Sequence, residues 1–561
     1  MPIRICRVLV SQALVGLVLL AGCTHSAAVR PQAAPVSTDP KALLTEADAA
    51  VARGDLVAAA AAYRRAAELS GDEAVAEQAT RAAYDSHQLR AAAGAAQRWL
   101  TINPTSEEAR RYAGMAALRL HQLDEAEAEF SQLLDTAYIS PAAGFLALLP
   151  VMGDEGIPTD VTELLRRLVA KRPKVAEGHY ALANAAMRSE NFALALSSAQ
   201  QATTLAPYWT PAKLMLARAT VAAGKEGEGL AMARDLVTAP DSDIATQLEY
   251  ALLLAGTGHD EEARAMLTPY ATGQTVIPGA IRSLGAMDLD AGALDDAQRH
   301  FEDLLSTGAQ SYESMYFLGV IAERRKDPER ALRYYSRVQG GDYAILAQQR
   351  VARIRADKSG LAAGLDHLEQ FAHAQPQNGP QIIAARAALA SAMDDEKQAL
   401  VILDDGIRRY PDLLSLRMDR VFLYERTGKD DAAVRDLRAL LAERPGDAVV
   451  QNALGYTLAD HGRQLEEAQG LIDAALAQSP DSAAILDSKG WLLHKQGKHE
   501  EALVYLERSR SFGNDPEIDL HVGEVQWALG RPQDARKTWQ DGLAKYPENR
   551  PLQERLKRAG P

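Results

Sequence analysis

The sequence has very little cysteine, few aromatic residues and no excess of positive charge. Its 561 residues include only two cysteines, and 6% are aromatic. Both cysteines, Cys6 and Cys23, lie near the N-terminus, so no internal disulfide can stabilise the rest of the chain and packing must do so. The net charge of -14 has the wrong sign for holding a phosphate backbone, so we expect no nucleic-acid partner.

A membrane-spanning apolar run is also missing at the N-terminus. The apolar run from Val8 to Leu20 has 13 residues, fewer than the roughly 20 that a membrane-spanning helix needs. Arg4 and Arg7 precede this run, and Leu20-Ala21-Gly22-Cys23 ends it. This order of positive, apolar and small residues is typical of a secretion signal.

The motif Leu20-Ala21-Gly22-Cys23 resembles the lipobox of bacterial lipoproteins, whose cysteine carries acyl chains after the signal is removed. The resemblance implies that residues 1–22 are a signal peptide and that Cys23 is lipidated. Thr24 implies sorting to the outer membrane, with the chain on the periplasmic side. Residues 23–39 contain prolines among small residues, which favours a flexible tether. The alternative is an ordinary signal peptide that happens to precede a cysteine.

Small residues recur along the chain every 33 to 35 residues. They occupy fifteen positions: Ala59, Ala92, Ala126, Val161, Ala195, Gly229, Ala263, Ala297, Ala331, Gly364, Ala399, Ala433, Ala468, Ala502 and Ala535. Proline follows twelve residues later in eight of the fifteen units: Pro104, Pro173, Pro207, Pro376, Pro411, Pro445, Pro480 and Pro547. A fixed period of this length indicates a repeat architecture.

Each unit reads as a helical hairpin. Apolar residues follow the small position at helical spacing, as in Ala331, Tyr335 and Val338. A second small residue usually lies twelve positions earlier, as at Gly490, so two helices can approach closely. Turn signals such as Gly428-Lys429 separate the two small positions.

This pattern resembles the tetratricopeptide repeat. The resemblance implies an all-α, right-handed solenoid of about 15 hairpins over residues 40–549, with a capping segment at residues 550–561. The pattern is irregular near Val161, near Gly364 and at Arg463-Gln464, where we expect distorted repeats.

Motifs that carry chemistry are missing from the sequence. Gly224-Lys225-Glu226 lacks the flanking residues of a phosphate loop. His499-Glu500-Glu501 resembles the start of a zinc-protease helix, but Leu503 stands where the second histidine should be. We therefore expect no enzyme activity, no cofactor, no metal site and no small-molecule substrate, and an enzyme with an unrecognised site is the least favoured hypothesis.

A surface for protein partners is the remaining prediction. In a tetratricopeptide unit the first helix lines the concave groove, and aromatic anchors within a polar rim are typical of binding hot spots. The predicted partner-binding residues are Asn452, Tyr456, Asp460, Asp487, Trp491, His494, Lys495, His521, Glu524 and Trp527. The alternative is that Trp491 and Trp527 only fill gaps between hairpins.

The late repeats also carry more specific phrases. Asn452 to Asp460, Ile485 to Trp491 and His521 to Trp527 resemble a subfamily of proteobacterial outer-membrane tetratricopeptide lipoproteins. Members of that subfamily are adaptors for a periplasmic carboxyl-terminal processing protease that degrades peptidoglycan hydrolases. The resemblance implies a lipid-anchored scaffold that binds this protease and its hydrolase substrates. The alternative is an assembly factor for exported polysaccharide, pili or outer-membrane proteins.

Overall fold

The computed structural model describes residues 37–155, 157–273, 276–512 and 515–560. Over these residues the chain is all-α, with 31 α-helices, one 3-10 turn and no strand. The predicted fold class is therefore confirmed. The predicted signal peptide and Cys23 lie outside the described residues.

The helices of the first half of the chain have similar lengths. They are α1 (Pro40–Ala52), α2 (Leu56–Leu69), α3 (Glu73–Asp85), α4 (Leu89–Ile102), α5 (Glu107–Arg119), α6 (Leu123–Thr136), α7 (Pro141–Glu155), α8 (Pro158–Lys171), α9 (Ala176–Arg188), α10 (Phe192–Leu205), α11 (Thr210–Ala222), α12 (Glu226–Thr238), α13 (Ile244–Gly256), α14 (Asp260–Thr272), α15 (Pro278–Asp290) and α16 (Leu294–Ser306).

The second half continues the same alternation. Its elements are α17 (Ser311–Arg324), α18 (Pro328–Tyr335), α19 (Ala344–Ser359), α20 (Leu361–Ala374), the 3-10 turn η1 (Pro376–Asn378), α21 (Gly379–Ala392), α22 (Glu396–Arg409), α23 (Leu414–Arg426), α24 (Asp430–Glu443), α25 (Ala448–Asp460), α26 (Leu465–Gln478), α27 (Ala483–Lys495), α28 (His499–Phe512), α29 (Pro516–Ala528), α30 (Pro532–Lys545) and α31 (Arg550–Ala559).

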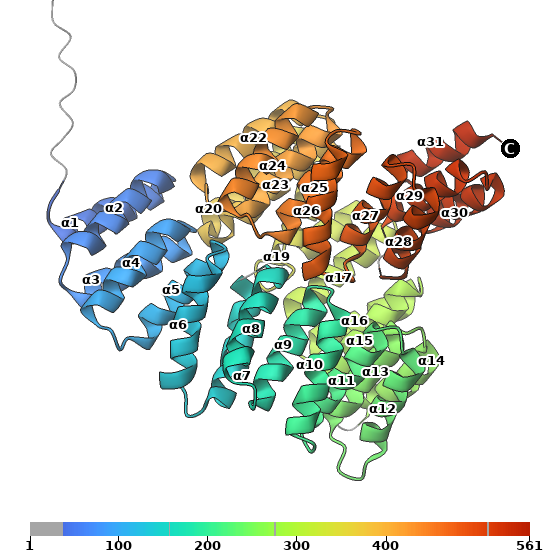
Figure 1. Cartoon of the computed structure of the whole chain (residues 1–561), viewed down its shortest axis with the longest axis horizontal. Helices are drawn as coiled ribbons and strands as arrows, with labels where there is room; N and C mark the ends of the chain where they lie inside the picture. The colour runs from blue at the N-terminus through green and yellow to red at the C-terminus, as the bar shows by residue number, and fades with distance from the viewer. Residues whose placement is uncertain (1–36, 156, 274–275, 513–514, 561) are drawn as a thin grey trace, which may run out of the picture. The chain divides into compact units, whose positions relative to one another are not determined.

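Consecutive helices pair as hairpins from α1 and α2 to α29 and α30, except that α7 packs more against α9 than against α8, and α31 packs on the last hairpin (Figure 1). All fifteen predicted small positions fall on the second helix of a hairpin and are buried. Where the small residue on the first helix is glycine, it lies against the side chain four positions after the small residue of the second helix. At Gly490, for example, a β-carbon would lie only 2.5 Å from Leu506 Cγ and 3.0 Å from the Ala502 carbonyl oxygen. The close helix approach inferred from paired small residues is therefore present.

The hairpin of α17 and α18 departs from the predicted pattern. We expected Ala331, Tyr335 and Val338 on one helix, but α18 ends at Tyr335 after eight residues. Val338 is nevertheless completely buried, because the loop carries it back into the core. The buried Gln348 side chain of α19 donates a 2.8 Å hydrogen bond to the Val338 carbonyl oxygen and so replaces the missing helical turn. The distortion expected near Gly364 lies in this preceding hairpin.

Candidate partner-binding site in the late repeats

The ten predicted side chains come from the first helices of three consecutive hairpins, α25, α27 and α29. Helix α27 contacts both α25 and α29, so residues one repeat apart can meet. Each end of the group is held by an aspartate cap. Asp447 accepts hydrogen bonds from the backbone N–H of Val449 and Val450 at the start of α25, and Asp515 accepts one from Glu517 N–H at the start of α29.

Trp491 lies at the centre of this group. Its indole Nε1 donates a 2.8 Å hydrogen bond to Asp460 Oδ1, and its ring stacks on His521 with centroids 4.0 Å apart. His494 stacks on the same indole at 5.0 Å, and the ammonium of Lys495 lies 4.7 Å from the ring centroid. Only 9% of Trp491 is exposed. This indole therefore organises its neighbours and has little free surface for a partner.

A buried ion pair joins α27 to α29. His521 Nδ1 lies 2.8 Å from Asp487 Oδ2, and both side chains are almost fully buried. His521 Nε2 lies 4.0 Å from Glu517 Oε1, and the Tyr456 hydroxyl donates a 2.6 Å hydrogen bond to the same oxygen. Seven of the ten predicted residues thus belong to one continuous network with Glu517: Tyr456, Asp460, Asp487, Trp491, His494, Lys495 and His521.

The electrostatics of the network follow from burial and from these contacts. Burial opposes the charged form of His521, but the neighbouring Asp487 carboxylate outweighs it and raises the pKa of His521. Burial would raise the pKa of Asp460, but hydrogen bonds from Trp491 and Lys495 outweigh it and lower that pKa. Burial lowers the pKa of His494 to about 4, with nearby cationic groups adding to the effect. The Asp487 carboxylate thus favours the charged form of His521, whereas His494 is neutral at neutral pH.

The other predicted residues lie around this network or beside it. Asn452 is half-buried, and its Oδ1 has no hydrogen-bond partner. Glu524 forms an ion pair with Arg555 of α31, and burial raises the pKa of Glu524. Trp527 is 41% exposed, stacks on Trp539 at 6.0 Å and has the Arg536 guanidinium 5.9 Å from its ring centroid. Of the two tryptophans, Trp527 is the accessible one.

The repeat pattern did not predict two acidic residues of the site. Glu517 links Tyr456 to His521, and Glu425 of the preceding hairpin pairs with the Thr457 hydroxyl. Burial raises the pKa of Glu425. The spacing of Glu517 four positions before His521 on one helix was the available signal for the first of these contacts.

Two kinds of feature are absent from the described residues, a metal-binding cluster and a membrane-spanning helix. No group of three or more histidine, cysteine or acidic side chains among them could hold a metal ion. No helix in the part of the chain that the structure describes has the length and apolar character needed to cross a membrane.

The comparisons with known proteins agree with the repeat architecture. A family model described as tetratricopeptide repeat matches residues 288–344, 423–483 and 452–517. The TPR repeat-containing protein PA4667 of Pseudomonas aeruginosa is 34% identical over 207 residues, which are 37% of this chain and 35% of that protein. Cellulose synthase 2 operon protein C of Komagataeibacter xylinus is 24% identical over 297 residues, covering 42% of this chain and 22% of that protein. The chain thus spans about a third and about a fifth of these two relatives.

Solved structures of low sequence identity also match. The Cut9–Hcn1 hetero-tetramer of APC/C is 14% identical with a TM-score of 0.32, and the match covers 93% of this chain and 96% of that chain. Yeast Tom70 is 12% identical with a TM-score of 0.32, covering 93% and 94%. The hairpins and their 34-residue spacing form a helical repeat array, and the tetratricopeptide-repeat model matches the part of it at residues 288–344 and 423–517. Proteins of this class present extended surfaces to protein partners.

Proposed function

We propose that this protein is a non-catalytic scaffold that binds a carboxyl-terminal processing protease and its cell-wall hydrolase substrates at the outer membrane. The observation that carries the proposal is the network of hydrogen bonds, ion pairs and stacked rings that joins α25, α27 and α29. These helices lie in the segment whose sequence motifs resemble that adaptor subfamily. Lipidated Cys23 would hold the scaffold at the membrane. Binding enzyme and substrate on one scaffold raises their effective concentration near each other.

The contacts of the late repeats support a binding surface that is ordered before a partner arrives. Asp460 is fixed by Trp491 and Lys495, yet 42% of its side chain is exposed. A partner that meets such a carboxylate has little side-chain entropy left to remove. Trp527 adds an accessible aromatic ring beside a guanidinium, a combination enriched in binding hot spots.

Affinity capture from envelope extract tests the partner assignment. We expect the anchored wild-type protein to capture the protease and wall hydrolases, and Trp527→Ala to weaken capture by about 30-fold, the equivalent of about 2 kcal/mol for a hot-spot residue. Tyr208→Ala is the matched control, because Tyr208 is an exposed aromatic far from the late repeats in the sequence. Capture of neither enzyme class by the wild-type protein would refute the assignment.

The membrane anchor needs a separate test. We expect Cys23→Ser to give a soluble or unprocessed protein, because the thiol that carries the acyl chains is gone. Unchanged fractionation of this variant with the outer membrane would rule out the anchor while leaving the scaffold proposal intact.

A second candidate function is assembly of an exported polysaccharide. The similarity to a cellulose synthase operon protein favours it over the other assembly roles. Deletion of the gene separates the two candidates. Loss of a secreted polymer with unchanged hydrolase levels would support assembly, whereas accumulation of wall hydrolases with normal secretion would support the protease scaffold.

A further inference from the structure

Hairpins that are far apart in the sequence touch along one line, which we call the seam. On one side lie the turns within the early hairpins of α3 to α10. On the other lie the loops that precede α21, α23, α25 and α27. Figure 1 shows the early helices α4 and α5 ending next to α20. The contacts across the seam join residues that are 287 to 325 positions apart.

The first part of the seam joins the α3–α4 turn to the loop before α23. The Gln88 side chain donates a 2.9 Å hydrogen bond to the Arg409 carbonyl oxygen, and Gln88 is buried. Arg90 Nη1 lies 2.5 Å from Asp412 Oδ1, and only 5% of the Asp412 side chain is exposed. Leu413 packs against the apolar core of the early hairpins. The contact therefore combines an apolar residue with two buried polar side chains, Gln88 and Asp412, and one exposed guanidinium, that of Arg90.

Two further contacts extend the seam along the chain. Arg444 Nη2 donates a 2.9 Å hydrogen bond to the Arg119 carbonyl oxygen at the end of α5. Asp481 N–H donates to the Glu190 carbonyl oxygen at 3.1 Å, and Asp481 Oδ2 accepts a 2.9 Å hydrogen bond from Phe192 N–H. Asp481 and Arg444 are both buried. Backbone groups at helix ends, which would otherwise face solvent, are thus satisfied across the seam.

The turns on the early side of the seam have an unusual backbone. Most other hairpin turns place glycine in the left-handed region, but His87, His121 and Glu190 occupy it with φ of 59°, 61° and 54°. Side chains are disfavoured there, and His87 and Glu190 make contacts across the seam that offset this cost. His87 Nε2 lies 2.9 Å from the Gln377 carbonyl oxygen across the seam. The Glu190 carbonyl oxygen accepts the Asp481 N–H described above.

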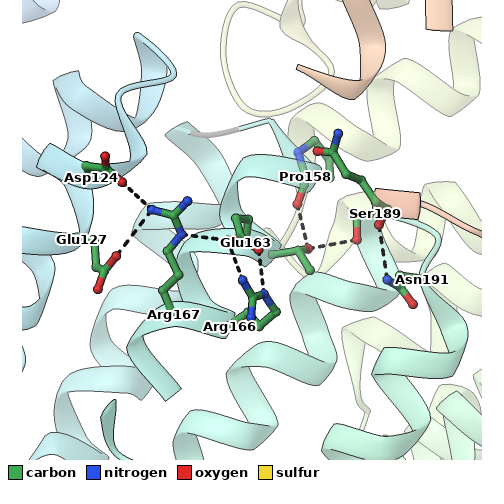
Figure 2. Close-up of polar contacts among 10 residues, drawn as sticks. Asp124, Glu127, Pro158, Glu163, Arg166, Arg167, Ser189 and Asn191 are labelled. Carbon is green, nitrogen blue, oxygen red and sulfur yellow. Dashed lines mark hydrogen bonds and ion pairs between the residues drawn. The ribbon is translucent and has the colours of Figure 1, made fainter. Parts of the chain in front are cut away.

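A cavity of about 600 Å³ separates the second and third contacts. Its early wall includes Glu125 and Arg167, and its late wall includes Ala477 and Gln478. Figure 2 shows that Arg167 reaches Asp124 and Glu127 on its own side, at 2.6 and 3.5 Å. Two lining residues of the cavity do reach across the seam: Glu443 Oε2 lies 3.9 Å from Arg90 Nη2, and the Asn191 side chain donates a 3.3 Å hydrogen bond to the Gln478 carbonyl oxygen. The seam is closed at separate points, with an open space between them.

We propose that the seam is a releasable latch, at which the early and late hairpins separate as folded bodies when the buried contacts of Asp481 and Arg444 are broken. Polar contacts hold the two sides together with a smaller set of apolar ones, such as Leu413 on the early core and Phe192 against Phe512. Each hairpin, in contrast, has its own buried apolar core. Release would move α25, α27 and α29 relative to the early repeats and so change access to the candidate site. In this last respect alone the inference rests on the proposed function.

A distance measurement on the isolated chain tests the latch. The chain has no cysteine after Cys23, so Glu125→Cys and Ala477→Cys, on opposite walls of the cavity, can carry spin labels in a Cys23-free protein. We expect one short distance in the parent. Asp481→Ala removes the carboxylate that accepts the hydrogen bond from Phe192 N–H. We expect the ratio of open to closed molecules to rise by about tenfold or more. A second, longer distance between the labels should then appear, while the helical circular-dichroism signal stays unchanged.

Asp515→Ala is the matched control, because Asp515 stands 34 residues after Asp481 and caps α29 within its own hairpin. It should leave the short distance unchanged. Arg444→Gln is a second opening variant in case Asp481→Ala disturbs its own hairpin. A long distance in the parent, an unchanged distance in both opening variants, or opening only with loss of helix would each overturn the latch. Failure here leaves partner capture untouched, so the two proposals fail separately.

Discussion

Close helix packing at the small positions predicts that replacing glycine by alanine destabilises the protein at a packed position and stabilises it at an exposed one. Gly490→Ala places a β-carbon 2.5 Å from Leu506 Cγ and 3.0 Å from the Ala502 carbonyl oxygen. Ordinary carbon contacts are about 3.5 to 4.0 Å, so Leu506 or all of α28 must move by roughly 1 Å. Leu506 is completely buried and has no free space to enter. Overpacking of this kind costs about 1–3 kcal/mol.

Gly470→Ala is the matched control. Gly470 lies inside α26, is exposed, and has nothing within 4 Å of its would-be β-carbon. Alanine favours a helix interior over glycine by about 1 kcal/mol, and both variants receive this gain. The difference between the two changes in unfolding free energy therefore isolates packing, and we expect it to be about 1–3 kcal/mol, with Gly470→Ala the more stable.

The assay is urea unfolding, monitored by both tryptophan fluorescence and circular dichroism. Trp491, one of the five tryptophans, lies on the same helix as Gly490, so the fluorescence signal includes a contribution from the changed hairpin. A repeat array need not unfold in one step, and agreement of the two probes is the condition for comparing free energies. Equal stabilities of the two variants would refute the inference that small residues set the helix separation.

Three other perturbations follow from the same structure. Burial depresses the pKa of His494 from 6.5 to about 4, so between pH 6.5 and pH 4 His494 is protonated in the unfolded chain but not in the folded one. The free energy of unfolding should therefore fall as the pH falls from 6.5 to 4. His494→Gln should flatten this slope when unfolding is measured as a function of pH. Lys326→Gly should raise stability by about 1 kcal/mol, because Lys326 has a φ of 60° and no described ionic partner. His121→Gly should lower stability by about 2 kcal/mol, because the buried carboxylate of Asp160 loses its partner at 2.9 Å. Thermal unfolding measures both changes and distinguishes their signs. Ala331→Leu should cost about 1–3 kcal/mol in the same assay, since Ala331 is completely buried between helices, and a neutral result would contradict the packing assigned to it.

Much of the fold could be predicted from the sequence because the determinants of a hairpin are local. Ala331, Gly490 and the closing Pro480 each act within one or two repeats, so their spacing is enough to place two helices and a turn. The short α18 could not be predicted in this way. Its end at Tyr335 depends on Gln348, which replaces helical hydrogen bonds from the next helix, and no period in the sequence marks that role.

The candidate site was predictable in position and less so in accessibility. Counting along the first helices brought Tyr456, Asp460 and Trp491 together, because equivalent positions of stacked helices are neighbours. The count does not distinguish Trp491, which is 9% exposed, from Trp527, which is 41% exposed. That difference arises because Trp491 is covered by His521 from the following repeat, whereas α29 is followed by the last hairpin helix and the short α31.

The repeat pattern of the sequence does not predict the seam. The entropy of closing a long loop implies that the seam forms after the hairpins. Asp481 meets Phe192 across 289 positions of chain. Closing a flexible loop of that length costs about 2 kcal/mol more entropy than closing one 34-residue repeat. Folded hairpins between the two ends remove most of this cost, because they restrict the chain before the ends meet. The contact at Asp481 therefore depends on the intervening hairpins, while those hairpins do not depend on it. This asymmetry allows the seam to open without unfolding the repeats.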